Sequence, residues 1–201
     1  IGKKNMDFIE EKDLHQGPIV SFANSSEKAY ALTSKACLET IDASKPLTSH
    51  APFMSSMATK IGKMVFPTGF SEVFACMGNQ EIRIYNVSEQ KELLRISLQN
   101  KADAGAECNC LEFMPDGKAI ITGWTDGKVR AFTPQSGKLL YIINDCHVVK
   151  PFGGTPLKAP QGLATMVNYG VTSVSPSSDN QSLLTGGHDC EVRLWTIGHS
   201  T

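Results

Sequence analysis

Thr185, His147 and Asp189, near the end of the 201-residue chain, have the side chains that nucleophilic catalysis uses. A hydroxyl beside an imidazole that a carboxylate orients could act as nucleophile, base and orienting acid. The same three residues, together with the indole of Trp195, could instead form a buried chain of hydrogen bonds. In that chain the indole N–H faces the hydroxyl, the hydroxyl faces the ring, and the ring faces the carboxylate.

These residues occupy fixed positions of an internal sequence repeat. The pattern charged, β-branched, arginine, aliphatic, aromatic, polar occurs three times, and a polar turn residue stands six positions before each aromatic residue. The three segments are Glu81–Asn86, Lys128–Thr133 and Glu191–Thr196, and the turn residues are Asn79, Asp126 and Asp189. Because the candidate residues recur beside an aromatic residue at repeat positions, we expect a structural network and no catalytic site, since a nucleophile must be accessible to its substrate.

Apolar strands flank each copy of the pattern, which makes four short strands per full repeat. The aromatic residues lie 47 and 63 residues apart, against about 40–45 for a propeller blade. The chain is therefore predicted to be all-β, a single partial propeller over residues 1–201 with roughly four blades of a larger β-propeller. The predicted repeats are at about 17–50, 61–98, 108–143 and 170–198, and a Pro/Gly-rich insertion loop lies at 148–169.

The polar network is incomplete outside the last repeat. The preceding repeat has Thr122 and Asp126, but Phe132 stands where the last repeat has tryptophan, and no histidine occurs within 99–107. In the last repeat, the long insertion that follows His147 could carry this histidine out of reach of its partners.

Arg83, Arg130 and Arg193 occupy one position of the repeated pattern. They could form a ladder that binds a partner. They alternate with apolar neighbours along predicted strands, as outward-facing residues do. We therefore expect ordinary arginines, either exposed to solvent or between blades.

Composition excludes several function classes. The chain has 19 Lys and Arg against 20 Asp and Glu, a formal charge of −1, so no basic surplus favours nucleic acid as a partner. No apolar stretch approaches the ~20 residues that cross a bilayer. The first residues contain no initiator Met and no apolar signal core, so we expect a piece of a longer protein that is not exported.

Six cysteines occur without a CxxC pair or paired histidines, and they predict reduced thiols in a cytosolic protein. They are Cys37, Cys76, Cys108, Cys110, Cys146 and Cys190. Cys108 and Cys110 are expected on one face of a strand, where packing is favoured over a metal or redox role. No metal and no cofactor is predicted.

Longer sequence segments resemble those of a known family. Leu183–Asp189 followed by Glu191–Trp195 is typical of WD repeats, and the chain resembles the WD-repeat proteins. Three segments are similar to sequences of ciliary and flagellar members of this family: Met64–Ala75, Phe113–Lys118 and Trp124–Phe132. The resemblance implies a non-enzymatic scaffold in the cytoplasm, within the axoneme of a cilium or flagellum, that contacts tubulin and other proteins inside doublet microtubules.

A different class would use the same fold. A soluble WD-repeat adaptor of a ligase or of a trafficking complex would also bind proteins through a propeller. In either case the insertion loop, with Lys150, Phe152 and Lys158, is the candidate partner-binding segment.

Overall fold

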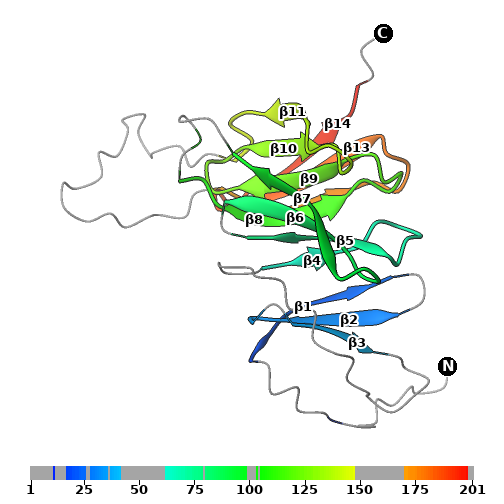
Figure 1. Ribbon diagram of the computed structural model, residues 1–201. Coiled ribbons are helices and arrows are strands. Elements are labelled where there is room, and N and C mark those ends of the chain that lie inside the picture. The colour runs from blue at the N-terminus through cyan, green and yellow to red at the C-terminus, as the bar shows by residue number, and fades with distance from the viewer. Residues whose placement is uncertain are drawn as a thin grey trace, which may run out of the picture.

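A computed structural model describes residues 11, 17–25, 28–35, 37–41, 62–78, 80–98, 103, 105–147 and 170–198 of the chain. Apart from Asp103, which is in a 3₁₀ turn, the secondary structure within these ranges consists of β-strands, which confirms the all-β prediction. The strands form four antiparallel sheets that follow one another in chain order (Figure 1). No helix in the described part of the chain is long and apolar enough to cross a membrane.

The four sheets are here called blades 1 to 4, and their strands pair in sequence order. Blade 1 contains β1 (Ile19–Asn24), β2 (Ala29–Thr33) and β3 (Leu38–Ile41), and blade 2 contains β4 (Met64–Val65), β5 (Val73–Met77), β6 (Glu81–Asn86) and β7 (Lys91–Ser97). Blade 3 contains β8 (Cys108–Phe113), β9 (Ile120–Trp124), β10 (Val129–Phe132) and β11 (Leu139–Ile143), and blade 4 contains β12 (Val171–Pro176), β13 (Ser182–Gly187) and β14 (Val192–Thr196). The predicted first repeat extends to about residue 50, and its last part, residues 42–50, lies outside the described residues.

The core consists of apolar layers between neighbouring blades. The layer between blades 2 and 3 includes Ile82 and Leu111, each fully buried, and the layer between blades 3 and 4 includes Ile121 and Val171. Tyr30 of blade 1 packs in the same way against blade 2. A sheet with two apolar faces is stable only when both are covered, so each blade depends on its neighbours.

Equivalent turns of the blades share a left-handed backbone conformation even where the residue type differs. Between the first and second strands of blades 2, 3 and 4, the left-handed position is held by Gly69, Gly117 and Asn180, with φ of 79°, 69° and 59°. In the hairpin that follows the second strand, Gly127 (φ 77°) of blade 3 corresponds to Cys190 (φ 63°) of blade 4. This conformation is sterically unfavourable for a residue with a Cβ, and glycine has no such penalty.

The cysteines pack as small apolar residues, and all six are free thiols. Five are buried, whereas Cys190 is exposed in its turn. Burial raises the pKa of Cys76 and of Cys110 to about 12 and also raises the pKa of Cys108, so these thiols stay protonated at neutral pH.

Thiol labelling provides a first test of this packing. With a maleimide at pH 7, we expect one rapidly labelled cysteine per folded chain, because the thiolate is the reactive form and only Cys190 is exposed. Mass spectrometry should find six labels after unfolding in urea and no rapid label in the variant Cys190→Ser. Rapid labelling of the folded variant would contradict the buried placement of the other five.

Candidate functional site

The structure brings together the four residues predicted for the network of blade 4. The indole Nε1 of Trp195 donates to Oγ1 of Thr185 over 3.0 Å, and Nε2 of His147 lies 2.9 Å from the same oxygen. Nδ1 of His147 lies 2.7 Å from Oδ1 of Asp189. Because a carboxylate only accepts, the proton of the imidazole is on Nδ1, and the Thr185 hydroxyl donates to Nε2.

His147 joins two blades. Its backbone N–H donates to the carbonyl of Gly127 in the hairpin between β9 and β10 of blade 3 (3.1 Å), while its ring reaches β13 of blade 4. This backbone anchor keeps the histidine in place although a long segment separates it from β12. A Cβ on Gly187 would lie 2.3 Å from Cγ of His147, so the ring fits only against a glycine.

Asp189 is the charged end of the network, and its side chain is 6% exposed. Nη1 of Arg193 donates to Oδ2 of Asp189 over 2.7 Å and lies 2.6 Å from Nδ1 of His147. Two donors cannot bond each other, so Asp189 is the acceptor that Arg193 and His147 share. Burial alone would raise the pKa of Asp189, but the hydrogen bonds from Arg193 and His147 outweigh this effect and lower it to about 2.

This depressed pKa predicts an acid-dependent loss of stability. The pKa of Asp189 is lower in the folded chain (about 2) than its ordinary value of 3.8, so its stabilising contribution is complete above pH 3.8 and is lost as the pH falls through 2. The shift corresponds to about 2 kcal/mol. Urea unfolding of the wild type and of Asp189→Asn should therefore differ most near pH 5, and the difference should shrink towards pH 2. A pH-independent difference would contradict the assignment.

Blade 3 fills the equivalent space with a different residue. Thr122 and Asp126 lie at the repeat positions of Thr185 and Asp189, and Trp124 lies at the position of Gly187. The indole Nε1 of Trp124 donates to Oγ1 of Thr122 over 2.7 Å, and this hydroxyl donates to the carbonyl of Arg130. One tryptophan thus takes the place that a histidine and a glycine share in blade 4.

Arg130 corrects the expectation for the repeated arginines. Its side chain is 1% exposed, and Nη2 lies 2.6 Å from Asp103 and 2.6 Å from Asp126. Its guanidinium lies 5.2 Å from the ring centre of Trp124, within the range of a cation–π contact. Nε of Arg130 has no hydrogen-bond partner among the described residues. Of the two expected placements, exposed to solvent or between blades, exposure to solvent does not apply to Arg130, because two aspartates neutralise its charge inside the protein.

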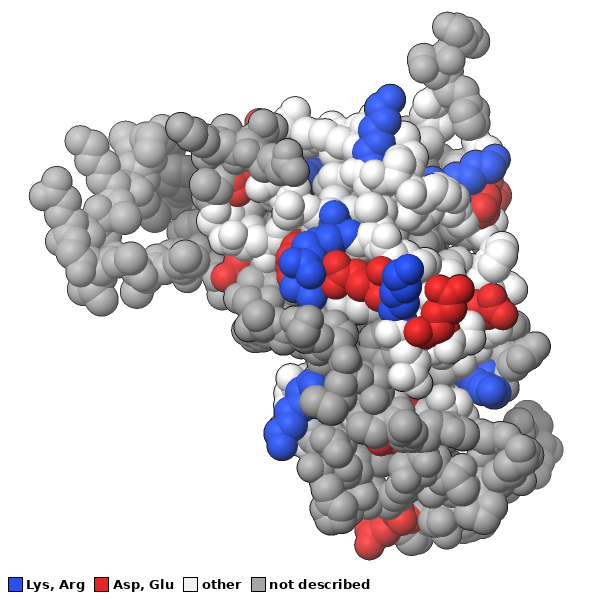
Figure 2. All heavy atoms as spheres, viewed as in Figure 1, with Lys and Arg blue, Asp and Glu red and all other residues white. Residues whose placement is uncertain are grey.

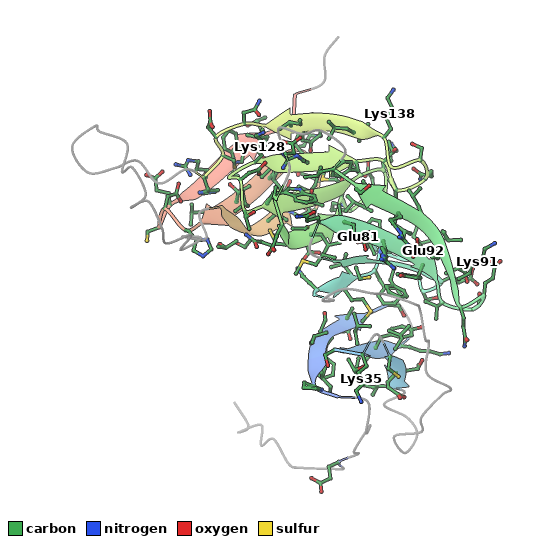
Figure 3. All side chains as sticks on the ribbon, turned by 60° about the vertical axis from the view of Figure 1, so that its left-hand side comes forward. Lys35, Glu81, Lys91, Glu92, Lys128 and Lys138 are labelled. Carbon is green, nitrogen blue, oxygen red and sulfur yellow. The ribbon has the colours of Figure 1, made fainter. Side chains whose placement is uncertain are left out.

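Arg83 is also buried, with 6% of its side chain exposed. It pairs with Glu81 of its own strand and with Glu92 of β7, which also accepts from the hydroxyl of Tyr85. In Figure 3, Glu81 and Glu92 are labelled on these neighbouring strands. Acidic and basic side chains lie next to each other across the middle of the face shown in Figure 2. The pairs that Arg83 and Arg130 make with acidic residues show that these two arginines belong to ion pairs and not to a basic ladder.

These arrangements hold blades together and present no reacting group to a substrate. Thr185 and His147 are each 1% exposed. The Thr185 hydroxyl, which would have to act as the nucleophile in catalysis, therefore cannot be reached from solvent. Within the described ranges, no three His, Cys, Asp or Glu side chains are placed to hold a metal ion. Lys150, Phe152 and Lys158, the predicted partner-binding residues, lie outside the described residues.

Comparison with known proteins identifies the repeats. The model of the WD domain, G-beta repeat, matches residues 97–133 and 163–196. These two matches cover the strands that carry the networks of blades 3 and 4.

Curated relatives cover more of the chain. It is 38% identical over 138 residues to the human cilia- and flagella-associated protein 52 and 40% identical over 135 residues to the protein of that name from Chlamydomonas reinhardtii. The alignments take in 69% and 66% of this chain but only 18% and 21% of the relatives, so the chain spans about a fifth of their length.

Two solved structures share the fold. The crystal structure of the computationally designed Ika4 protein has a TM-score of 0.61 at 14% identity, with 97% of this chain and all of that chain aligned. The β-propeller domain of Cps50 (Swd1) from Myceliophteria thermophila has a TM-score of 0.64 at 14% identity, with 90% of this chain and 52% of that chain aligned. Similarity at this identity shows the fold alone, and it confirms the predicted β-propeller.

Proposed function

Because this chain carries WD repeats on a β-propeller fold and is homologous to cilia- and flagella-associated protein 52, we propose that it is part of a protein scaffold of the cilium or flagellum. The scaffold binds tubulin and other proteins inside the doublet microtubules of the axoneme. The observation that carries this proposal is the 37–40% identity over about two thirds of the chain to relatives named for cilia and flagella.

The chemistry of the described residues agrees with a scaffold. WD repeats and this homology point to a non-enzymatic interaction module. The hydroxyl, imidazole and carboxylate that could perform catalysis are used as hydrogen-bond partners between blades 3 and 4. The segment 148–169, with Lys150, Phe152 and Lys158, is proposed as one partner contact because it interrupts the repeat between two blades.

Retention in axonemes tests the proposal. The complete protein that contains this chain is tagged in a ciliated or flagellated cell, and the axonemes are washed with detergent and high salt. An inner microtubule protein stays with the axoneme, whereas quantitative loss into the soluble fraction would contradict the proposal and favour a cytoplasmic adaptor of a ligase or a trafficking complex. A deletion of residues 148–169 in the same cells tests whether that segment contributes to retention.

A further inference from the structure

The outer face of blade 4 repeats the positions at which blades 2 and 3 pack against the blade that follows them. The strand registers make three residues equivalent in each of these blades: Ala75, Ile82 and Ile84 in blade 2, Ile121, Val129 and Ala131 in blade 3, and Leu184, Val192 and Leu194 in blade 4. The three residues of blade 2 belong to the apolar layer shared with blade 3, and those of blade 3 belong to the layer shared with blade 4. These positions are therefore where a blade contacts its successor.

Exposure at these positions depends on whether a blade follows. All three residues are at most 2% exposed in blades 2 and 3, whereas Leu184, Val192 and Leu194 are 45%, 71% and 72% exposed. Blade 4 lies at the opposite end of the series from blade 1, and no sheet within the described residues follows it (Figure 1). Aliphatic surface left in water is unfavourable, and a propeller covers it by stacking another blade on it.

The rest of this face has the composition of a layer between blades. Side chains alternate between the two sides of a strand, so the other residues on this side of β13 and β14 are Ser182, Gly186 and Thr196. None of them is charged, and charged residues are depleted where a contact is fully buried. The composition thus fits a contact that excludes water.

Gly186 stands where blade 3 admits the first strand of its successor. The equivalent residue of blade 3 is Gly123, and an added Cβ there would lie 2.6 Å both from Cys110 of its own blade and from Val171 of blade 4. At Gly186 the atoms within 4 Å of such a Cβ are the hydroxyl oxygens of Ser173 and Thr172, which both belong to blade 4 itself. The side of Gly186 that corresponds to the Val171 contact is therefore open to a further strand.

A blade that covers its predecessor contributes a large aliphatic side chain from its first strand. This position is held by Met64 in blade 2, Leu111 in blade 3 and Val174 in blade 4, as their pairing with the second strands shows. The three side chains are at most 5% exposed, and each belongs to the layer shared with the preceding blade. A blade that covers blade 4 in the same way has an aliphatic residue at this position.

We propose that the outer face of blade 4 is the docking face for a further propeller blade, supplied by the complete protein that contains this chain. The first strand of that blade places an aliphatic side chain against Leu184, Val192 and Leu194. The aligned regions are only 18% and 21% of the relatives' length, which leaves ample chain for such a blade. This apolar face is thus covered within the protein and is not a surface for tubulin or another partner.

Thiol labelling measures whether the face is covered. Leu194→Cys is prepared in the 201-residue chain and in the complete protein, each with Cys190→Ser, and maleimide labelling at position 194 is followed by mass spectrometry. We expect rapid labelling in the 201-residue chain and labelling slower by about tenfold or more in the complete protein, because a buried thiol is protected. Phe70→Cys is the matched control, since Phe70 is 61% exposed in blade 2, and it should be labelled at similar rates in both proteins. Circular dichroism shows which variants keep the fold.

Photo-crosslinking identifies what covers the face. The complete protein is produced with photo-leucine in place of leucine, and crosslinks from Leu184 and Leu194 are mapped in a mixture of isotopically light and heavy protein. We expect crosslinks within one polypeptide to the first two strands of another repeat. Equal labelling of Leu194→Cys in the two proteins, a crosslink between light and heavy copies, or a crosslink to a segment without the repeat pattern would each overturn the proposal.

These measurements use purified protein and do not depend on the ciliary role. If the complete protein is washed out of axonemes but protects position 194, the ciliary scaffold is excluded and the covered face stands. If it is retained in axonemes but position 194 is labelled rapidly, the scaffold proposal stands and the further blade on this face is excluded.

Discussion

Replacement of Arg130 by methionine is expected to lower the free energy of unfolding by about 3–5 kcal/mol. The guanidinium is 1% exposed and neutralises both Asp103 and Asp126, so its removal leaves two largely buried carboxylates with Lys128 as the remaining cation beside them. Breaking a buried ion pair from one side has an effect of this size, because the other charge loses its partner without regaining water. Urea denaturation, followed by circular dichroism, measures the change.

Arg95→Met is the control, since Arg95 also pairs with glutamate but its side chain is 49% exposed. An exposed pair contributes little to stability, because water and salt screen it. Adding Asp103→Asn and Asp126→Asn to Arg130→Met should recover part of the loss, because the carboxylates are then neutral. If Arg130→Met is no more destabilising than Arg95→Met, the buried cluster does not contribute as we infer.

Replacement of Thr185 by valine is expected to lower the free energy of unfolding by about 2–4 kcal/mol. Valine keeps the shape of the side chain but removes the hydroxyl, which leaves the Trp195 N–H and the buried Nε2 of His147 without their partner. Each unsatisfied buried group has an effect of about 1–3 kcal/mol. The Trp195 indole N–H resonance should shift in an NMR spectrum, because this N–H loses its acceptor.

The variant Thr185→Ser distinguishes the contribution of the hydroxyl to stability from that of the methyl group. Serine keeps both hydrogen bonds and loses one methyl group, so we expect a loss of about 1 kcal/mol and little change in the indole resonance. Equal destabilisation by serine and valine would show that packing at this position matters and that the hydrogen bonds do not.

Much of the fold could be predicted from the sequence because the repeat signals reinforce one another. The strand that ends on Trp195, the turn at Asp189 and the apolar runs before them agree in three repeats, and the strands of blades 2 to 4 lie where this pattern puts them. The first strand of blade 1, Ile19–Asn24, was not predicted, because the third strand of that blade, Leu38–Ile41, has neither the arginine nor the aromatic residue that marks the repeat.

The residues that complete the network of blade 3 were missed for a physical reason. The expected position for an indole is the third strand, where Phe132 stands, but Trp124 reaches the same threonine from the second strand. The residue at the same repeat position in blade 4 is Gly187. A glycine at this position indicates a turn and gives no sign that the other repeat has a hydrogen-bond donor there. Asp103 stands before β8, and only the folded chain shows that Arg130 reaches it over 2.6 Å.

The turns of blades 2, 3 and 4 have a consequence for how such repeats are detected. Gly69, Gly117 and Asn180 share one left-handed backbone conformation, as do Gly127 and Cys190, so blade 4 has a residue with a side chain where the other blades have glycine. A search that requires glycine at these positions misses Asn180 and Cys190, whereas one that scores the backbone angle φ finds a positive value at each of them. Diverged propeller repeats are therefore recognised more reliably by a tolerance for positive φ at fixed spacing than by a glycine at that position.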